Sequence, residues 1–219
     1  MATIVITGAN RGIGLELAKQ RCEDHDVIAA CRTASDALRA LDVRVEEGVD
    51  VADDASVHAL AERLSGTSVD VLINNAGILK SESLDDMNLG SIRQQMEVNA
   101  LGPLRVTAAL GSALHEGAKV AIITSRMGSI ADNTSGGRYG YRMSKAAVNM
   151  AGVSLAHDLR GKGVAVALLH PGYVRTGMTG NSGHVEAHES AAQLWDRIDG
   201  LSLENSGTFW HANGEVLPW

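Results

Sequence analysis

Short apolar runs alternate with longer amphipathic stretches along this chain. The apolar runs are mostly continuous in Val, Ile, Leu and Ala rather than alternating with polar residues, which is typical of strands covered on both faces. Seven of them are predicted to be strands, at Thr3–Thr7, Val27–Cys31, Val43–Val49, Val69–Asn74, Val120–Thr124, Val164–His170 and Gly207–His211. Four intervening segments are long enough for helices, at Gly12–Cys22, Asp53–Ser65, Leu89–His115 and Tyr141–Arg160. This order predicts an α/β fold, a doubly wound, mostly parallel sheet of seven strands with helices on both faces.

The length of the chain and the absence of a linker-like segment indicate one domain. A chain of 219 residues can bury one sizeable core and has little room for a second. It contains no internal repeat, no low-complexity tract and no linker. The polar, glycine-rich stretch Ser129–Gly137 is too short to separate two domains. We therefore expect residues 1–219 to form a single domain.

Composition changes this picture in one respect, the distribution of aromatic residues. Hydrophobic residues make up 45% of the chain and charged residues 21%, which excludes a disordered protein. Aromatic residues make up only 3%, and all of them lie at or after Tyr139. The N-terminal half must therefore build its core from aliphatic side chains, and any aromatic chemistry must come from the second half.

Charge and cysteine content exclude several classes of function. The net charge is −7 and no run of Lys or Arg forms a basic stripe, so nucleic-acid binding is not expected. Cys22 and Cys31 have no CxxC spacing and no nearby histidine cluster, so neither a disulfide scaffold nor a metal site is predicted. The segment Met1–Thr7 becomes strand-like at once, and no stretch approaches the length of a membrane span. We expect a cytoplasmic protein without a membrane partner.

The first predicted strand leads through a glycine-rich turn into a helix. The turn, Thr7–Gly14, places glycines at positions 8, 12 and 14. Backbone N–H groups and the helix dipole favour a pyrophosphate at such a junction, and a Cβ there would block close approach or strain the backbone. The spacing differs from the commoner G-x-G-x-x-G, but its position at the first βα junction favours dinucleotide binding over a mere tight turn. A single-domain, NAD(P)-binding Rossmann fold is the prediction.

The choice of cofactor is expected at the end of the second strand. An acidic residue there contacts the ribose 2′-OH of NAD, whereas an arginine accommodates the 2′-phosphate of NADP. This chain has Arg32 and no carboxylate until Asp36. Arg32 and Arg11 could form a fork around a phosphate, which favours NADP(H) and leaves NAD(H) possible. Asp50 is a candidate acceptor for the adenine amino group, or alternatively the N-cap of the following helix.

Three motifs together carry a family resemblance. The turn Thr7–Gly14, the run Asn74-Asn75-Ala76-Gly77 and the segment Tyr141-Arg-Met-Ser-Lys145 resemble the short-chain dehydrogenase/reductase family. The resemblance runs from Thr3 to the C-terminus. Within the family the chain is most similar to the small, carbonyl-reductase-like members of the sniffer and C-factor type.

Tyr141 and Lys145 can be analysed independently of the resemblance. Residues four apart on a helix lie on one face. A lysine ammonium near a phenol favours the phenolate, so we expect Lys145 to lower the pKa of Tyr141. A lowered pKa would suit Tyr141 to general acid–base catalysis near neutral pH. The resemblance implies that Tyr141 protonates a substrate carbonyl oxygen and that Lys145 holds the nicotinamide ribose.

The resemblance also implies a serine that orients the carbonyl and an asparagine in a proton relay. Ser125 matches the family pattern at a strand end, but it precedes Tyr141 by more residues than is usual, and Ser129 is the competing candidate. Ser125 is preferred because ligands bind at the carboxyl ends of strands in open α/β sheets. Asn99 matches the asparagine that holds the relay water to Lys145. The predicted catalytic set is Ser125, Tyr141, Lys145 and Asn99.

The cofactor-binding prediction combines these motifs with the Pro-Gly turn after the sixth strand, where Val174 and Thr176 are implied to meet the nicotinamide carboxamide. The full predicted set is Gly8, Asn10, Arg11, Gly12, Ile13, Gly14, Arg32, Asp50, Val51, Asn75, Ala76, Gly77, Tyr141, Lys145, Pro171, Gly172, Val174 and Thr176. His170, just before the turn, receives no role.

The sequence therefore predicts an NADPH-dependent oxidoreductase that interconverts a carbonyl and an alcohol. A non-catalytic NADP(H)-binding regulator is the alternative, and a dehydratase or epimerase is a third possibility. A short loop at about residues 177–189 is expected to cover the substrate, a small-molecule carbonyl or alcohol. The resemblance implies a homodimer or homotetramer formed through the long helices.

Overall fold

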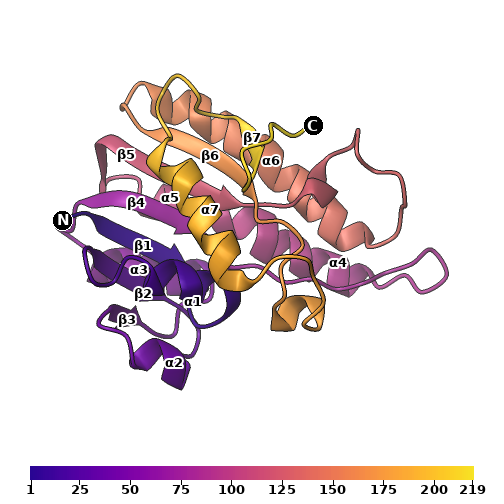
Figure 1. The fold of residues 1–219 in the computed structure, drawn as a ribbon, viewed down its shortest axis with the longest axis horizontal. Coiled ribbons are helices and arrows are strands. Elements are labelled where there is room, and N and C mark those ends of the chain that lie inside the picture. The colour runs from indigo at the N-terminus through magenta and orange to yellow at the C-terminus, as the bar shows by residue number, and fades with distance from the viewer.

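The computed structural model describes all 219 residues and has one seven-stranded, fully parallel sheet (Figure 1). The strands are β1 (Thr3–Thr7), β2 (Asp26–Ala30), β3 (Arg44–Glu46), β4 (Val69–Asn74), β5 (Leu114–Ile123), β6 (Ala165–His170) and β7 (Phe209–His211). Their order across the sheet is β3-β2-β1-β4-β5-β6-β7. The chain therefore starts in the middle of the sheet, builds one half outward and then crosses to build the other. This reversal between β1 and β4 opens a crevice at the carboxyl ends of the strands, where ligands bind in such folds.

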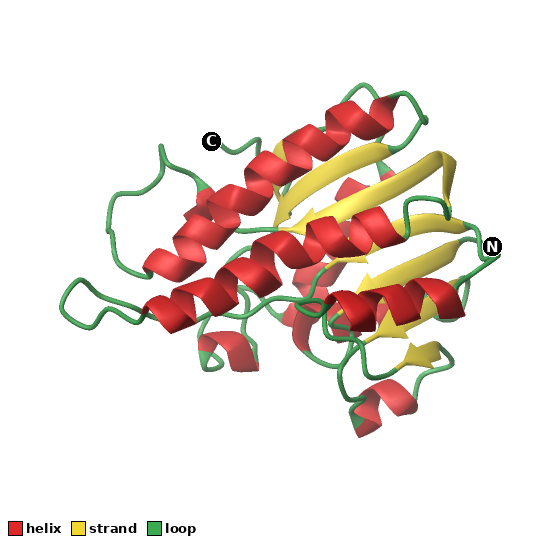
Figure 2. Cartoon of the chain, turned by 180° about the vertical axis from the view of Figure 1, so that it is seen from behind, coloured by secondary structure: helices red, strands yellow, loops and turns green.

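Helices cover both faces of the sheet (Figures 1 and 2). One face carries α1 (Gly12–Lys19), α2 (Asp36–Arg39) and α7 (Ala187–Asp199). The other carries α3 (Asp54–Arg63), α5 (Gly102–Ala109) and the long α6 (Tyr139–Arg160), with α4 (Leu89–Met96) packed beside α6. The predicted doubly wound, single-domain Rossmann fold is confirmed.

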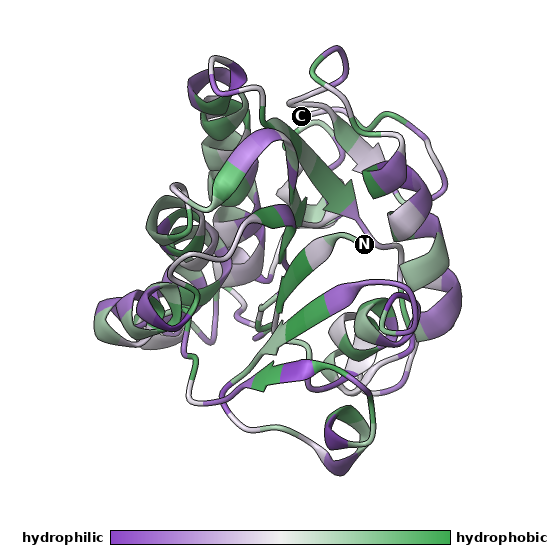
Figure 3. Ribbon diagram, turned by 90° about the vertical axis from the view of Figure 1, so that its left-hand side faces the viewer, coloured by the Kyte–Doolittle hydropathy of each residue, from purple (hydrophilic) through white to green (hydrophobic).

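Two aliphatic layers hold the fold together, as the scarcity of aromatic residues predicts. Neighbouring residues on β1 point to opposite faces: Ile4 and Ile6 pack under α1 and α7, whereas Val5 packs under α3 and α5. Apolar residues follow one another along the strands for this reason, and Figure 3 shows them as a hydrophobic sheet between helices with polar outer faces. Trp195 on α7 is the one tryptophan in the first layer that is fully enclosed.

The predicted helix Leu89–His115 is wrong in its extent. It is divided into α4, a π-helical turn at Glu97–Leu101 (η1) and α5, and it ends at Ala109. Residues 114–119 instead extend β5, which begins before the predicted Val120. An apolar run of this length does not reveal where a helix ends and a buried strand begins, because both bury continuous apolar residues.

Two helices were not predicted. The short α2 begins at an N-cap where Ser35 accepts a hydrogen bond from the Leu38 N–H at 3.2 Å. Before α7, the carboxylates of Glu186 and Glu189 form a reciprocal capping box. Because α7 occupies residues 187–199, the predicted substrate loop 177–189 is shorter than expected, and it contains a single 3-10 turn, η3 (Gly177–Thr179).

Candidate active site

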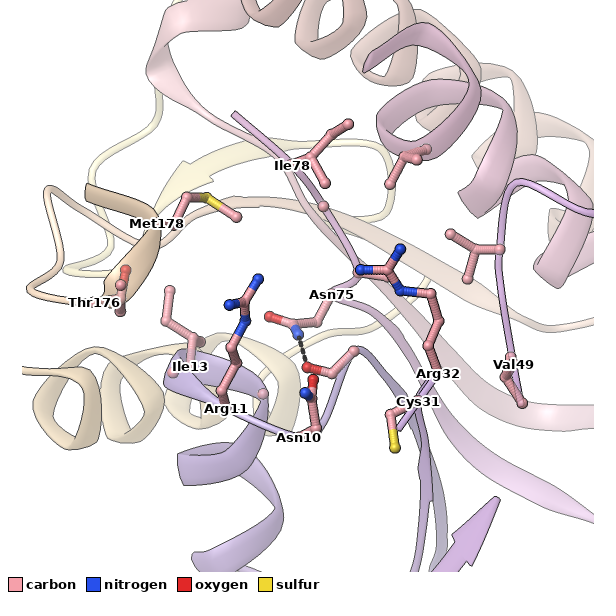
Figure 4. Close-up of a pocket in the computed structure, with 18 of the residues that line it drawn as sticks. Asn10, Arg11, Ile13, Cys31, Arg32, Val49, Asn75, Ile78, Thr176 and Met178 are labelled. Carbon is pink, nitrogen blue, oxygen red and sulfur yellow. Dashed lines mark hydrogen bonds between the residues drawn. The ribbon is translucent and has the colours of Figure 1, made fainter. Parts of the chain in front are cut away.

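A cavity of ≈ 330 Å³ lies at the carboxyl ends of β1, β2 and β4, where the strand order reverses. Figure 4 shows it between the glycine-rich turn, the segment after β4 and the turn that contains Thr176 and Met178. Its walls are formed by Gly8, Asn10, Arg11, Gly12, Ile13, Gly14, Cys31, Arg32, Val49, Asp50, Val51, Asn75, Ala76, Gly77, Ile78, Val98, Thr176, Gly177 and Met178. The structure thus brings together most of the residues predicted to bind a dinucleotide.

The glycines of the turn are required by the protein's own packing. Gly8 has φ +66°, and a Cβ on it would lie 2.8 Å from the Cα of Ala76. A Cβ on Gly14 would lie 2.5 Å from both the Asn75 side-chain nitrogen and the Gly8 carbonyl oxygen. The Asn75 amide in turn donates to the carbonyl oxygens of Thr7 (3.0 Å) and Gly8 (3.1 Å). The run after β4 therefore locks the turn in place, an interaction that the sequence alone did not reveal.

The first turn of α1 faces the cavity without a side-chain cap. Its N-cap residue, Arg11, has an extended backbone and makes no capping hydrogen bond. Gly12, Ile13 and Gly14, the first three helical residues, all line the cavity. Their N–H groups and the positive end of the helix dipole fit an anionic group such as a pyrophosphate. The residues present therefore fit a dinucleotide cofactor.

Two arginines approach the same end of the cavity from different elements. Arg11 extends from the glycine turn and Arg32 from the end of β2, and Figure 4 shows both guanidinium groups directed into the cavity. Asp50 is the one acidic residue in the cavity wall. Its carboxylate accepts a hydrogen bond from the Ala52 N–H at 3.0 Å, so it shapes the loop after β3. The N-cap of α3 is Asp53, which settles the alternative role considered for Asp50.

The predicted proton-transfer groups converge beside this cavity. Lys145 is buried, its Nζ donates to the Ile123 carbonyl oxygen at 2.9 Å, and it lies 5.7 Å from the centre of the Tyr141 ring. A Cβ built on Gly77 would lie 3.9 Å from this Nζ, so the lysine adjoins the cavity wall. Ser125 lies two residues beyond the end of β5, and its hydroxyl is close enough to the Tyr141 phenol to lower the pKa of that phenol.

The pKa of Tyr141 differs from the prediction. Burial raises the pKa of the phenol, and this effect outweighs the influence of the Ser125 hydroxyl and the positive charge of Arg138, which both lower the pKa. Burial also lowers the pKa of Lys145 to about 8. The expected lowering of the Tyr141 pKa by Lys145 is therefore wrong for this structure, because burial of the phenol disfavours its charged form more strongly than the neighbouring groups favour it.

Asn99 lies in the π-helical turn η1, a local irregularity that often marks functional sites. Its side-chain oxygen accepts from the Ile78 N–H and its nitrogen donates to the Ile78 carbonyl, both at 2.8 Å. The same nitrogen donates to the Ser144 hydroxyl at 3.0 Å, and this hydroxyl donates to the Tyr141 carbonyl at 2.9 Å. Asn99 thus connects the segment after β4 to the helix that carries Tyr141 and Lys145.

Ser129, the alternative to Ser125, uses its hydroxyl group in other hydrogen bonds. Its hydroxyl donates to the carbonyl oxygen of Trp219 at 3.0 Å and accepts from the Asp132 N–H at 3.1 Å. The ring of Trp219 stacks on Phe209 at a centroid distance of 5.4 Å. Ser129 therefore anchors the C-terminal tail, whereas Ser125 is the serine beside Tyr141.

Several predicted cofactor residues lie outside the cavity wall. Pro171 accepts a hydrogen bond from Ser190, and Gly172 and Val174 pack near Val185. His170 forms an edge-to-face pair with His211 at 4.9 Å, and burial lowers its pKa to about 3. The histidine is therefore neutral at physiological pH.

Some wall residues were missed by sequence reasoning. Cys31, Val49, Ile78, Val98, Gly177 and Met178 line the cavity but were not predicted to bind the cofactor. They are apolar or small and carry no chemical signature, although all of them except Met178 adjoin a predicted residue in sequence. Glu82 was missed as well: its buried carboxylate accepts from the Gly140 N–H at 3.1 Å and from the Gln95 side chain at 2.7 Å, which fixes the start of α6.

Comparison with known proteins identifies the family of the chain. A family model described as short chain dehydrogenase matches residues 2–187. The chain is 45% identical to 1-hydroxy-2-glutathionyl-2-methyl-3-butene dehydrogenase of Rhodococcus sp. (strain AD45), with 100% of both chains covered. It is also 46% identical to C-signal of Myxococcus xanthus over 74% of this chain and 100% of that one.

Solved structures give the same result. The carbonyl reductase Sniffer of D. melanogaster superposes with a TM-score of 0.91 at 28% identity, with 100% of both chains covered. The NADPH-bound carbonyl reductase from chicken fatty liver superposes with a TM-score of 0.89 at 30% identity, covering 100% of this chain and 99% of that one. None of the helices described above combines the length and apolar character that a membrane span requires. The motifs, the fold and the comparisons together show that the chain belongs to the short-chain dehydrogenase family and is an oxidoreductase of the carbonyl reductase type.

Proposed function

We propose that the protein reduces a small aldehyde or ketone to an alcohol, or catalyses the reverse reaction, with NADPH as the cofactor. The observation that carries this proposal is the arrangement of Ser125, Tyr141 and Lys145 beside the cavity at the strand reversal. A protein that only sensed NADP(H) would have no use for two hydroxyl groups and a buried amine at the edge of its cofactor cavity.

The proposed roles follow from the chemistry of each side chain. When bound, the nicotinamide supplies the hydride for reduction. Ser125 donates a hydrogen bond that orients the substrate carbonyl, and Tyr141 gives its phenolic proton to the carbonyl oxygen. Because its pKa is raised by burial, Tyr141 holds this proton at neutral pH and is suited to act as the acid in reduction. Lys145 lies beside the phenol. Asn99 connects α6 to the segment that follows Gly77 through its hydrogen bonds to Ser144 and Ile78.

The preference for NADP(H) is supported by the two arginines and by relatives. Arg11 and Arg32 face a part of the cavity whose β2 end offers no carboxylate for a ribose hydroxyl. Similar structures from chicken and from Burkholderia multivorans have NADPH or NADP bound. NAD(H) remains a possible second cofactor in this proposal.

The proposed assembly is a homodimer or homotetramer of a cytoplasmic protein. Exposed apolar side chains lie on the outer helices, at Leu89 and Leu101 and, on α6, at Met143 and Met150. A second copy packed on these helices would remove them from water.

The decisive experiment is the replacement Tyr141→Phe, which removes the proton donor and leaves the ring. We expect NADPH oxidation with a panel of aldehydes, ketones and quinones to fall by about 10²–10⁴-fold, while NADPH binding measured by fluorescence titration is retained. Ser125→Ala is expected to reduce turnover in the same panel.

Tyr139→Phe, two positions earlier on α6, is the matched control and should retain turnover. Full activity of Tyr141→Phe on a good substrate would refute the proposed mechanism. If the unaltered protein binds NADPH tightly but turns over no member of the panel, the alternative of a non-catalytic NADP(H)-binding regulator is favoured instead.

A further inference from the structure

Two loops extend from the same end of the molecule, beyond the carboxyl ends of the strands (Figures 1 and 2). One joins β4 to α4 and the other joins the 3-10 turn Arg126–Gly128 (η2) to α6. They meet where the Arg138 N–H donates to the Glu82 carbonyl oxygen at 2.8 Å. Arg138 is therefore fixed by its backbone immediately before the helix that carries Tyr141.

The backbone of Arg138 is left-handed, with φ +49° and ψ +46°. This conformation is strained for residues that carry a Cβ, and it suits glycine or asparagine better. Gly136 and Gly137, directly before it, also have positive φ. An arginine in this place is unfavourable for the backbone, so its side chain is the feature that needs an explanation.

The Arg138 guanidinium is exposed and contacts the side chain of Met127, which lies two residues after Ser125. Its Nη1 is 3.9 Å from the sulfur of Met127, and the Met127 N–H donates to the Ser125 hydroxyl. Its positive charge is close enough to Tyr141 to lower the pKa of the phenol, against the larger effect of burial. Arg138 therefore lies near both Ser125, through Met127, and Tyr141.

No carboxylate pairs with this guanidinium, whereas other arginines of the chain have partners. Arg126 pairs with Asp132 and Glu215, and Arg175 pairs with Glu186. Arg142, on the same helix, is held by the Ser135 hydroxyl and the Gly136 carbonyl. Acidic residues outnumber basic ones by 26 to 19 in this chain, so the missing partner does not reflect a shortage of acids.

We propose that Arg138 binds a carboxylate of the substrate, so that the protein acts on carbonyl compounds that also carry an acid group, such as semialdehydes of dicarboxylic acids. A guanidinium matches a carboxylate through two parallel N–H···O bonds, which fixes orientation as well as charge. This would hold the carbonyl at a set distance from Ser125 and Tyr141. The inference rests on the carbonyl reduction proposed above and adds the chemical class of its substrate.

The test compares each acid with its own methyl ester. Succinic semialdehyde and glutaric semialdehyde, with their methyl esters, are assayed with NADPH, and the ratio of kcat/KM for acid to ester is measured. In the unaltered protein we expect the better of the two acids to be favoured by about tenfold or more. In Arg138→Gln this ratio should fall close to one, mainly through a higher KM for the acid, and Arg138→Lys should keep part of it. The ratio cancels any general effect of the substitution on Tyr141.

Arg142→Gln removes the same charge one turn away and should leave the ratio unchanged. A ratio near one for both pairs in the unaltered protein, or an unchanged ratio in Arg138→Gln, would overturn the carboxylate site. If neither acids nor esters are turned over, the panel of aldehydes, ketones and quinones described above tests the proposed function separately. Binding of γ-hydroxybutyrate to the NADP⁺ complex, measured by calorimetry, then decides the site: binding that Arg138→Gln abolishes supports it, and no binding overturns it.

Discussion

Arg11 and Arg32 line the same cavity, although they come from different structural elements. Arg11 belongs to the turn before α1, and Arg32 follows β2, yet both side chains point into one cavity (Figure 4). Neither forms an ion pair with a carboxylate, whereas nearby Arg39 is bound by both oxygens of Glu47. Free guanidinium groups on both sides of a cavity are suited to a phosphate.

The substitution Arg32→Ala tests the role of this pair of arginines. Arg32→Ala should weaken NADPH binding by roughly tenfold to a hundredfold, because a charge-assisted hydrogen bond contributes about 1.5–3 kcal/mol. NADH, which lacks the 2′-phosphate, should be affected much less. Fluorescence titration of both cofactors measures the difference, with Arg39→Ala as the control outside the cavity. An equal loss for the two cofactors would contradict the phosphate fork.

At the scale of elements, the site depends on how the turn before α1 packs on the segment after β4. Thr7 at the end of β1 accepts hydrogen bonds from the N–H groups of Asn75 and Ala76, both at 3.1 Å. Asn75 returns two bonds to the turn, and Gly14 leaves just enough room for its amide. The turn before α1 and the segment after β4 therefore hold each other in place, and together they form this part of the cavity wall.

Gly14→Ala tests this mutual packing. The new Cβ would lie 2.5 Å from the Asn75 nitrogen and the Gly8 oxygen, so one of them must move. We expect a loss of about 1–3 kcal/mol in the free energy of unfolding, typical of overpacking, together with weaker NADPH binding. Chemical denaturation measures the first effect.

Gly161→Ala at the end of α6 is the control, because nothing lies within 4 Å of its added Cβ and its φ is −66°. That substitution should change stability little. Identical unfolding curves for the original protein and Gly14→Ala would contradict the packing argument.

At the scale of the whole molecule, a carboxylate fastens the outer edge of the sheet to a covering helix. Glu46 on β3 is buried and accepts from Arg63 at the end of α3 at 2.5 Å and from Arg44 at 2.8 Å. Burial of this carboxyl opposes its ionisation, but the two arginines outweigh that effect and lower its pKa below the ordinary 4.5. The folded state therefore binds a proton at Glu46 less readily than the unfolded state.

Glu46→Gln should therefore destabilise the fold in a pH-dependent way. The contribution of the ionised carboxylate is complete above the ordinary pKa of 4.5 and is lost as the pH falls through the lowered folded value. We expect a loss of about 1–2 kcal/mol at pH 7, shrinking as the pH falls below 4.5. Denaturation at neutral and acidic pH checks this, with Glu62→Gln, an exposed carboxylate on α3, as the control. A difference that is constant with pH would refute the ionic origin.

The amino-acid sequence by itself determined the architecture and the chemical groups. Continuous aliphatic runs specified parallel strands covered on both faces, and the spacing of Tyr141 and Lys145 placed both on one helix face. These features are local, since periodicity and spacing along one element decide them. The same local reasoning did not find the end of the helix predicted at Leu89–His115, because buried helices and buried strands are equally apolar.

Only the tertiary structure decided which groups share an environment. It set Ser125 beside Tyr141 and bound Ser129 to Trp219, a choice between two serines that chain spacing could not make. It also reversed the expected pKa shift of Tyr141, because burial depends on everything packed around a phenol and not on one neighbour four residues away. Solvent exclusion and contacts between distant segments are properties of the assembled layers, so they appear only once those layers are packed.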